Sequence, residues 1–260
     1  MTNDSRLANI RVVLVEPSHP GNIGGTARAL KTMGLAQLAL VRPKRFPDPQ
    51  AEWRAAGAQD VLDAATVHDS LAAAIADCLW VVGTGMLTRR IPWPARDAAD
   101  AAAEILAQPA GARVAIVFGR ETSGLTNEEL QQCHCHLQIP ANPEYASLNL
   151  AMAVQVVAYE LYRQSQARPA GAELVPWDRP LAPMSHVEGL LEHLESALVT
   201  SRFLDARNPG QTMTRLRRLF TRVALDETEV QILRGMLTAL APDAPPVLAP
   251  PPAADAAPSS

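Results

Sequence analysis

Hydrophobic and polar positions follow two different periods along the first 165 residues of the chain. Short apolar runs bounded by turn-forming residues predict buried strands, and longer segments with apolar positions three or four residues apart predict amphipathic helices. The predicted strands cover residues 10–15, 37–42, 64–68, 79–83, 113–118 and a short run ending at 139. Because strands and helices alternate, we predict an α/β fold with a mainly parallel sheet.

Polar residues that suit helix N-caps mark where several of the helices should begin. Asn22, Asp69 and Ser147 each stand before an apolar-periodic segment, and Thr126 with Glu129 forms a capping box. A long helix is expected to open at Ser147. The further predicted helices cover residues 49–57 and 97–107, and the apolar stripe of the long helix consists of Leu150, Val154, Val157 and Leu161.

The pattern changes after residue 165. A segment with three prolines predicts a linker over 166–182, and amphipathic helices are expected at 184–203, 213–224 and 227–240. The Pro/Ala-rich end predicts disorder. We therefore expect an α/β domain over 1–165, a linker over 166–182, a small helical extension over 183–240 and a disordered tail over 241–260.

Composition excludes some classes of protein. The chain has 48% hydrophobic and 19% charged residues, which is typical of globular proteins. Its formal net charge of -4 means that any nucleic-acid binding would require a local basic face. There is no apolar run long enough for a membrane span, no signal-peptide pattern and only three cysteines. We expect a cytoplasmic protein without membrane contact.

Turn-rich loops follow four of the predicted strands, beginning near Glu16, Thr84, Gly119 and Ala141. In open α/β sheets, ligands bind at the carboxyl ends of the strands. The first of these loops leads into Pro20–Arg28, which has neither the glycine spacing of a dinucleotide site nor the Gly-Lys-Ser/Thr of a triphosphate loop. A nicotinamide-dependent dehydrogenase is therefore disfavoured.

Two clusters have both a structural and a functional interpretation. In Cys133-His-Cys-His136, strand geometry would turn the cysteines to one face and the histidines to the other, and the spacing differs from that of zinc sites, so no metal site is predicted. The second cluster is either a solvated helix face or a contact for RNA phosphates; it consists of Arg215, Arg217, Arg218 and Arg222.

Three segments, taken together, resemble the SPOUT superfamily of RNA methyltransferases. They are Asn22-Ile-Gly-Gly-Thr-Ala-Arg28, Phe118-Gly-Arg-Glu-Thr-Ser-Gly-Leu125 and Asn142-Pro-Glu-Tyr-Ala-Ser-Leu-Asn149. The resemblance implies a trefoil knot, a homodimer and S-adenosylmethionine as methyl donor. It further implies a tRNA substrate, methylated on the ribose 2'-hydroxyl of cytidine or uridine 32 in the anticodon loop.

The resemblance also assigns residues to roles. Arg28 and Ser147 would stand at the reacting centre with Asn22 beside them, while Glu121, which we expect to orient an arginine, and Asn149 would support them. The cofactor would contact Thr84, Gly85, Met86, Gly119, Ile139, Ala146, Ser147 and Leu148. Members of the family tend to carry Ser-Ala-Arg after the residue that corresponds to Thr84, whereas this chain has Gly85-Met86-Leu87.

Two other functions remain open at this stage. A SPOUT enzyme could act on another tRNA nucleotide or on ribosomal RNA. An RNA-binding protein that no longer catalyses transfer would be expected to lack Arg28, Asn22 or the serine and asparagine of the third segment, and this chain has all of them.

Overall fold

The structure is a computed structural model that describes residues 6–85, 94–167, 179–205 and 211–241. Within these residues a parallel sheet has the strand order β3-β2-β1-β6-β4-β7-β5. The strands are β1 (Ile10–Val15), β2 (Gln37–Val41), β3 (Thr66–His68), β4 (Trp80–Thr84), β5 (Ala95–Arg96), β6 (Val114–Phe118) and β7 (Cys135–Leu137). The predicted α/β class with a parallel sheet is confirmed. The knot stays a prediction.

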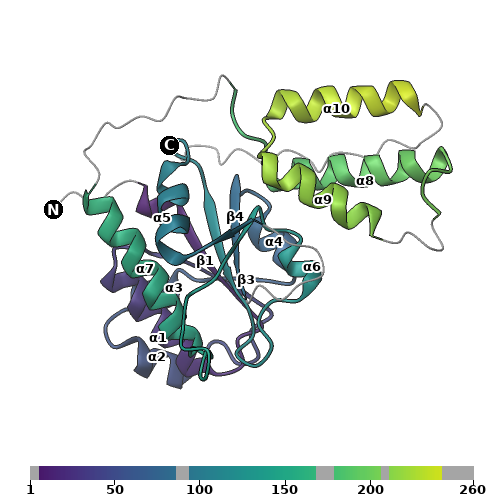
Figure 1. The fold of residues 1–260 in the computed structure, drawn as a ribbon. Helices are drawn as coiled ribbons and strands as arrows, with labels where there is room; N and C mark the ends of the chain where they lie inside the picture. Colours follow the sequence, from purple (N-terminus) through teal and green to yellow (C-terminus); the bar gives the residue numbers. More distant parts are fainter. Residues whose placement is uncertain (1–5, 86–93, 168–178, 206–210, 242–260) are drawn as a thin grey trace, which may run out of the picture.

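Helices cover both faces of the sheet (Figure 1). Because side chains alternate along a strand, Val12 and Leu14 of β1 pack on one face, whereas Val13 and Val15 pack on the other. The helices are η1 (Leu7–Asn9), α1 (Pro20–Thr32), α2 (Pro49–Ala55), α3 (Gln59–Asp63), α4 (Leu71–Ile75), α5 (Ala98–Ala107), α6 (Asn127–Leu130), α7 (Leu150–Ala167), α8 (Met184–Thr200), α9 (Thr212–Val223) and α10 (Glu227–Leu240).

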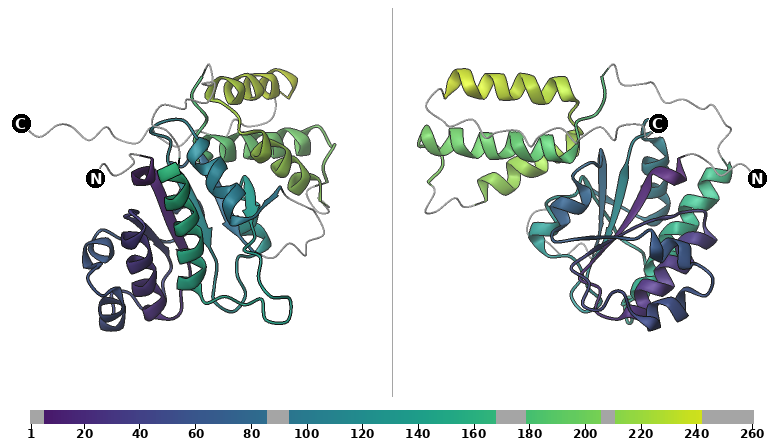
Figure 2. Two further views of the ribbon diagram at one scale, coloured as in Figure 1. Left: turned by 60° about the vertical axis from the view of Figure 1, so that its left-hand side comes forward. Right: turned by 180° about the vertical axis from the view of Figure 1, so that it is seen from behind.

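The two faces have different partners. The first apolar cluster joins the sheet to α1, α2, α3, α5 and α7, and α1 and α7 lie side by side in both views of Figure 2. The second joins the sheet to α4, α6, α8 and α10. At the start of α8, the amide of Met184 donates to the carbonyl of Cys78 at 3.1 Å. The C-terminal helices are therefore attached to the sheet through α8.

Three helix starts differ from the predictions. His19, not Asn22, caps α1, since its ring nitrogen accepts a hydrogen bond from the amide of Gly21 at 3.1 Å. Pro20 at the first helical position favours this earlier start. Ser70 rather than Asp69 caps α4. The long helix α7 begins at Leu150, three residues after Ser147.

Three short elements were not predicted from the sequence patterns. The helices η1 and α3 and the strand β5 have five residues or fewer, too few for a period to appear. The capping box of α6 is confirmed, and α10 has the predicted bounds. The predicted linker and tail fall mostly outside the described residues, and the domain boundaries stay a prediction. Among the described helices, none has the length and apolarity needed to cross a bilayer.

Candidate functional site

The loops predicted to bind a ligand meet at one edge of the sheet. Strands β6, β4 and β7 are neighbours, with Gly83 paired to Val117 and Thr84 paired to Leu137, so all three end at nearly the same level. The Thr84 hydroxyl donates to the Val117 carbonyl at 3.0 Å, and the Gly85 amide donates to the Leu137 carbonyl at 3.0 Å. Met86, which was assigned to the same loop, lies outside the described residues.

The loop after β6 closes so tightly that Gly119 has no space for a side chain. A Cβ on this buried glycine would lie 2.1 Å from the carbonyl carbon of Gly124 and 2.2 Å from the nitrogen of Leu125. Arg120 and Gly124 exchange two backbone hydrogen bonds, of 3.1 and 2.9 Å, and Gly124 has a φ of 66°, which favours glycine. Glycine at positions 119 and 124 therefore allows the loop to close on its own backbone.

Arg120 ties this loop to its neighbours, a role that the sequence patterns did not reveal. Its guanidinium forms ion pairs with Glu16 at 2.8 Å and with Glu129 at 2.9 Å. Hydrogen bonds that Arg120 donates to Glu129 and then to Glu16 raise the pKa of Arg120. Glu129 also accepts from the Thr126 amide at 2.7 Å as part of the capping box. The loops after β1 and β6 are thus fixed to α6.

Glu121 is bonded to the start of α1. Its carboxylate accepts from the amides of Ser18 and His19, from the Ser18 hydroxyl at 3.0 Å and from the Asn22 side chain at 3.0 Å. Partial burial would raise the pKa of Glu121, but hydrogen bonds from Asn22 and from backbone amides lower it to about 2. Among the described residues no arginine bonds to Glu121, and its role in orienting an arginine stays a prediction.

Asn149 completes a polar connection between the three motif segments. Its side-chain nitrogen donates to the Asn22 oxygen at 2.9 Å, and its own oxygen accepts from the Ala151 amide at 3.0 Å. Asn149 therefore occupies the capping position that was predicted for Ser147. The hydrogen bonds run from the start of α7 through Asn149 and Asn22 to Glu121. We name this series of three side chains the Asn–Asn–Glu connection.

Ser147 lies in the exposed loop between β7 and α7, together with Ala146 and Leu148. Within the described residues, the backbone amides of these three make no hydrogen bond. Ile139, at the start of the same connection, is half-buried and packs on the first apolar cluster. The loop thus leaves a row of amide donors open beside the carboxyl edge of the sheet.

Arg28 is exposed on the outer side of α1. One turn earlier, Gly24 faces α2, because a Cβ there would lie 2.0 Å from the Ala51 carbonyl oxygen, and Gly25 faces α7, because a Cβ there would lie 2.9 Å from the Ala151 methyl group. Arg28 follows these glycines by four and three residues, so it projects between the two contacts. In the described part of the chain its guanidinium has no hydrogen-bond or ion-pair partner.

The Cys-His-Cys-His segment is part of the core. Cys133 packs in the second apolar cluster and Cys135 in the first, so the prediction that both face the same way is wrong. The reason is that β7 begins only at Cys135. His134 stacks on Trp80 with ring centroids 4.7 Å apart and accepts from the Val81 amide at 3.0 Å.

The arginine cluster of α9 is not uniformly solvated. Arg217 forms an ion pair with Glu188 of α8 and so contributes to packing between the helices. Arg215 and Arg222 are exposed, and Arg218 is half-buried. Only part of the cluster thus faces solvent.

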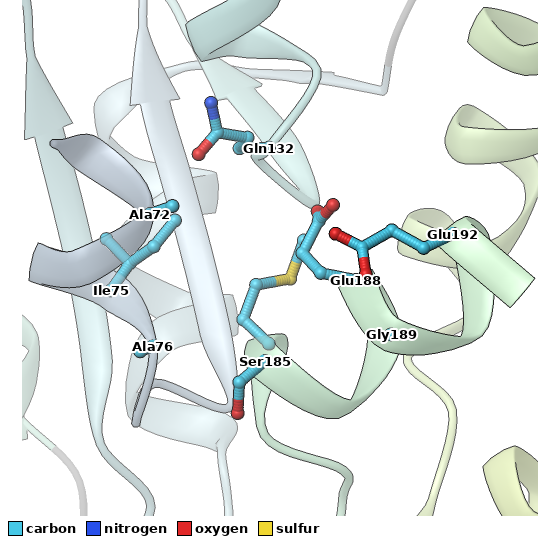
Figure 3. A pocket seen from close by; sticks show the side chains of 9 residues that line it. Ala72, Ile75, Ala76, Gln132, Ser185, Glu188, Gly189 and Glu192 are labelled. Atoms are coloured by element: carbon cyan, nitrogen blue, oxygen red, sulfur yellow. The ribbon is translucent and has the colours of Figure 1, made fainter. Parts of the chain in front are cut away.

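A cavity of about 320 Å³ lies elsewhere, between α4, the residue Gln132 after α6, and α8 (Figure 3). Its walls are Ile75 and neighbouring alanines on one side and Met184, Glu188 and Glu192 on the other. It contains none of the motif residues, and Glu188 is already paired with Arg217.

Comparison with known proteins explains why the three motif segments occur together in this chain. The model of the SpoU rRNA Methylase family matches residues 9–159. The chain belongs to the SpoU rRNA Methylase family. A second model, described as the tRNA methyltransferase TrmJ C-terminal domain, matches residues 185–246. The SpoU family match contains the whole Asn–Asn–Glu connection, and the resemblance inferred from the sequence is confirmed.

Relatives of this SpoU family member cover nearly its whole length. The tRNA (cytidine/uridine-2'-O-)-methyltransferase TrmJ of Klebsiella pneumoniae is 50% identical over 239 residues, which cover 90% of this chain and 97% of that protein. The TrmJ of Yersinia pestis is also 50% identical, with 90% and 92% covered. The crystal structure of TrmJ from Z. mobilis has a TM-score of 0.78 at 34% identity, with 90% and 99% covered. A probable methylase family protein from Haemophilus influenzae has a TM-score of 0.61 at 42% identity, with 90% and 96% covered.

Proposed function

We propose that this SpoU family methyltransferase transfers a methyl group from S-adenosylmethionine to the ribose 2'-hydroxyl of cytidine or uridine 32 in a tRNA anticodon loop. The observation that carries the proposal is the Asn–Asn–Glu connection, which joins all three motif segments at one edge of the sheet. The similarity to TrmJ proteins over 90% of the chain supports the choice of a tRNA ribose.

The residues at this edge fit S-adenosylmethionine. The open amides of Ala146, Ser147 and Leu148 can donate hydrogen bonds to the polar edges of an adenosine. Gly119 directly follows β6, the strand beside β4 in the sheet. Thr84, Gly85 and Ile139 line the neighbouring strand ends. When bound, the cofactor supplies an electrophilic methyl group on a positively charged sulfur.

In this proposal, Arg28 acts on the RNA. A ribose hydroxyl loses its proton as it attacks, so negative charge develops on its oxygen and must be stabilised. The unpaired guanidinium of Arg28 can stabilise that charge and hold an adjacent phosphate with two parallel hydrogen bonds. Ser147, exposed in the β7–α7 loop, is a candidate to relay the proton, since a guanidinium remains protonated.

Asn22 supports this centre by fixing the helix that carries Arg28. Both polar ends of its side chain are engaged, one by Glu121 and the other by Asn149. Because these partners come from the loop after β6 and from the start of α7, the first turn of α1 is held against both. Asn22 is therefore assigned a positioning role.

A homodimer is part of the same proposal. Met152, Val156 and Tyr159 form an exposed apolar stripe along α7. Their spacing of four and three residues places them on one face of the helix. A second copy of the chain that covers this face would exclude water from the side chains. Cytoplasmic localisation and RNA contacts by the exposed arginines of α9 remain predictions within this proposal.

The test is methyl transfer from labelled S-adenosylmethionine to unmodified tRNA, followed by nuclease mapping and nucleoside analysis. We expect 2'-O-methylcytidine or 2'-O-methyluridine at position 32. Arg28→Ala should abolish transfer, and Arg28→Lys should lose most of it because a lysine cannot make the two parallel hydrogen bonds. Arg179→Ala, an exposed arginine outside the three segments, is the matched control. Methylation of ribosomal RNA alone would refute the tRNA assignment while leaving the family unaffected.

A further inference from the structure

Of the eleven arginines and lysines described between residues 7–85 and 94–166, eight are paired with carboxylates and three are not. Between residues 7–85 and 94–166, the described arginines and lysines that form ion pairs are Arg11, Lys31, Arg42, Arg45, Arg96, Arg113, Arg120 and Arg163. In these ranges, Arg28, Lys44 and Arg54 have no carboxylate partner. A cation without a carboxylate partner can form an ion pair with an anionic ligand, because no internal carboxylate competes for it.

Two of the unpaired cations, Arg54 and Lys44, lie near the first half of α1, the helix that carries Arg28. The stem of Arg54 packs on α1, since its Cβ lies 2.9 Å from where a Cβ on Gly24 would be, and Gly24 is one turn before Arg28. The amide of Lys44 donates to the Pro17 carbonyl at 3.1 Å, which fixes Lys44 beside the loop that enters α1. Both residues therefore flank the helix that carries Arg28.

An exposed aromatic ring accompanies them. Trp53 of α2 is 73% exposed, and the guanidinium of Arg54 lies 5.2 Å from the centroid of its ring. An indole held by its own neighbour in this way offers a flat surface to solvent at little entropic cost. Single-stranded RNA is recognised by such surfaces, because unpaired bases stack on aromatic rings while cations contact the phosphates.

We infer that Trp53, Arg54 and Lys44 form a contact for the single-stranded nucleotides next to the methylated ribose. An unpaired base of the loop stacks on the Trp53 ring, and Arg54 and Lys44 contact the phosphates on either side. The inference rests on the proposed function, and it adds residues that lie outside the three motif segments. RNA is the partner because Arg54, whose guanidinium lies 5.2 Å from the ring centroid, and Lys44 have no carboxylate partner among the described residues and can pair with phosphates.

The experiment measures binding of the full-length protein to unmodified tRNA and to the isolated anticodon stem-loop. Trp53→Ala should weaken binding about tenfold, and Trp53→Phe should restore most of it, because stacking tolerates any flat ring. In turnover assays the KM for tRNA should rise while kcat stays nearly constant. Phe203→Ala removes an equally exposed ring, 72% exposed, and serves as the control.

The salt dependence of binding tests the two cations together, apart from the ring. If Lys44 and Arg54 each contact one phosphate, the double variant with alanine at both positions should reduce the slope of log affinity against log salt by about 1.4. Binding of S-adenosylmethionine and the oligomeric state should not change in any of these variants.

Several results would overturn the inference. It would be contradicted if Trp53→Ala bound tRNA with unchanged affinity, if Phe203→Ala weakened tRNA binding equally, or if the double variant had an unchanged salt slope. If Trp53→Ala instead dissociated the oligomer into single chains, the ring would be assigned to the contact between copies of the chain. In all these cases the unaltered protein still binds and methylates tRNA, so the proposed function stands. Failure of the unaltered protein to bind tRNA would refute both.

Discussion

Glu121 offers a quantitative test of the site because its carboxylate accepts four hydrogen bonds from the start of α1. In Glu121→Gln, the side-chain amide has a single acceptor oxygen, and its NH₂ group must face donors of Ser18, His19 or Asn22. The fall in the pKa of Glu121 from 4.5 to about 2 corresponds to about 3 kcal/mol. Since the carboxylate is partly open to water, we halve this for screening and expect a loss of about 1.5 kcal/mol.

The pH dependence of this loss follows from the direction of the pKa shift. A carboxyl group whose pKa is lowered by folding stabilises the protein fully above its unfolded pKa and loses that contribution as the pH falls toward the folded value. Glu121 should therefore contribute in full above about pH 4.5 and progressively less toward pH 2. At neutral pH we expect Glu121→Gln to lower Tm by about 3–6 °C.

The assay is thermal unfolding followed by circular dichroism, at pH values from 7 to 3, for the unaltered protein and the variant. Glu195→Gln makes the same change of charge at an exposed position of α8 without a hydrogen bond among the described residues, and it should have little effect. A difference in Tm between Glu121→Gln and the unaltered protein that persists unchanged at acidic pH would refute the reasoning. An equal fall in Tm in Glu121→Gln and Glu195→Gln would refute it as well.

Three further predictions concern neighbouring features. Gly119→Ala must open the loop after β6, and we expect about 3 kcal/mol of destabilisation in denaturant titrations and loss of S-adenosylmethionine binding in calorimetry. Asn149→Ala should cost about 1 kcal/mol through loss of the α7 cap, whereas Asn149→Asp should keep the cap but still reduce kcat, because a carboxylate cannot donate to Asn22. Burial raises the pKa of Cys78 and Cys135 to about 12, so both thiols should resist a thiol reagent at pH 8 until the protein unfolds; rapid reaction in the native state would contradict this.

The strands and most helices could be predicted because they depend on local patterns. The β-branched run at Ile10–Val15 and the capping box at Thr126 each fix an element from a few neighbouring residues. The order of strands could not be predicted in this way, because β6 lies between β1 and β4 through pairing of residues far apart in the chain.

Helix capping shows why local sequence patterns could not predict the contacts of the site residues. Asn22 and Ser147 are both suitable caps by residue type, yet neither caps its helix. His19 and Asn149 take the capping positions, and Asn22 forms bonds to residues about 100 or more positions away. A pattern within one helix contains no information about such partners. The same holds for Arg120, whose partner Glu16 belongs to a different loop.

The Asn–Asn–Glu connection gives a physical reason for the three segments to occur together in one chain. Asn22 can donate to Glu121 and accept from Asn149 only if its amide has one orientation, so each partner fixes the geometry that the other requires. Loss of Asn22 leaves both partners without one hydrogen bond, and loss of Glu121 or Asn149 leaves Asn22 with an unmet donor or acceptor. The effects of substituting two members should therefore be smaller than the sum of the single effects, as expected for side chains that act as one unit.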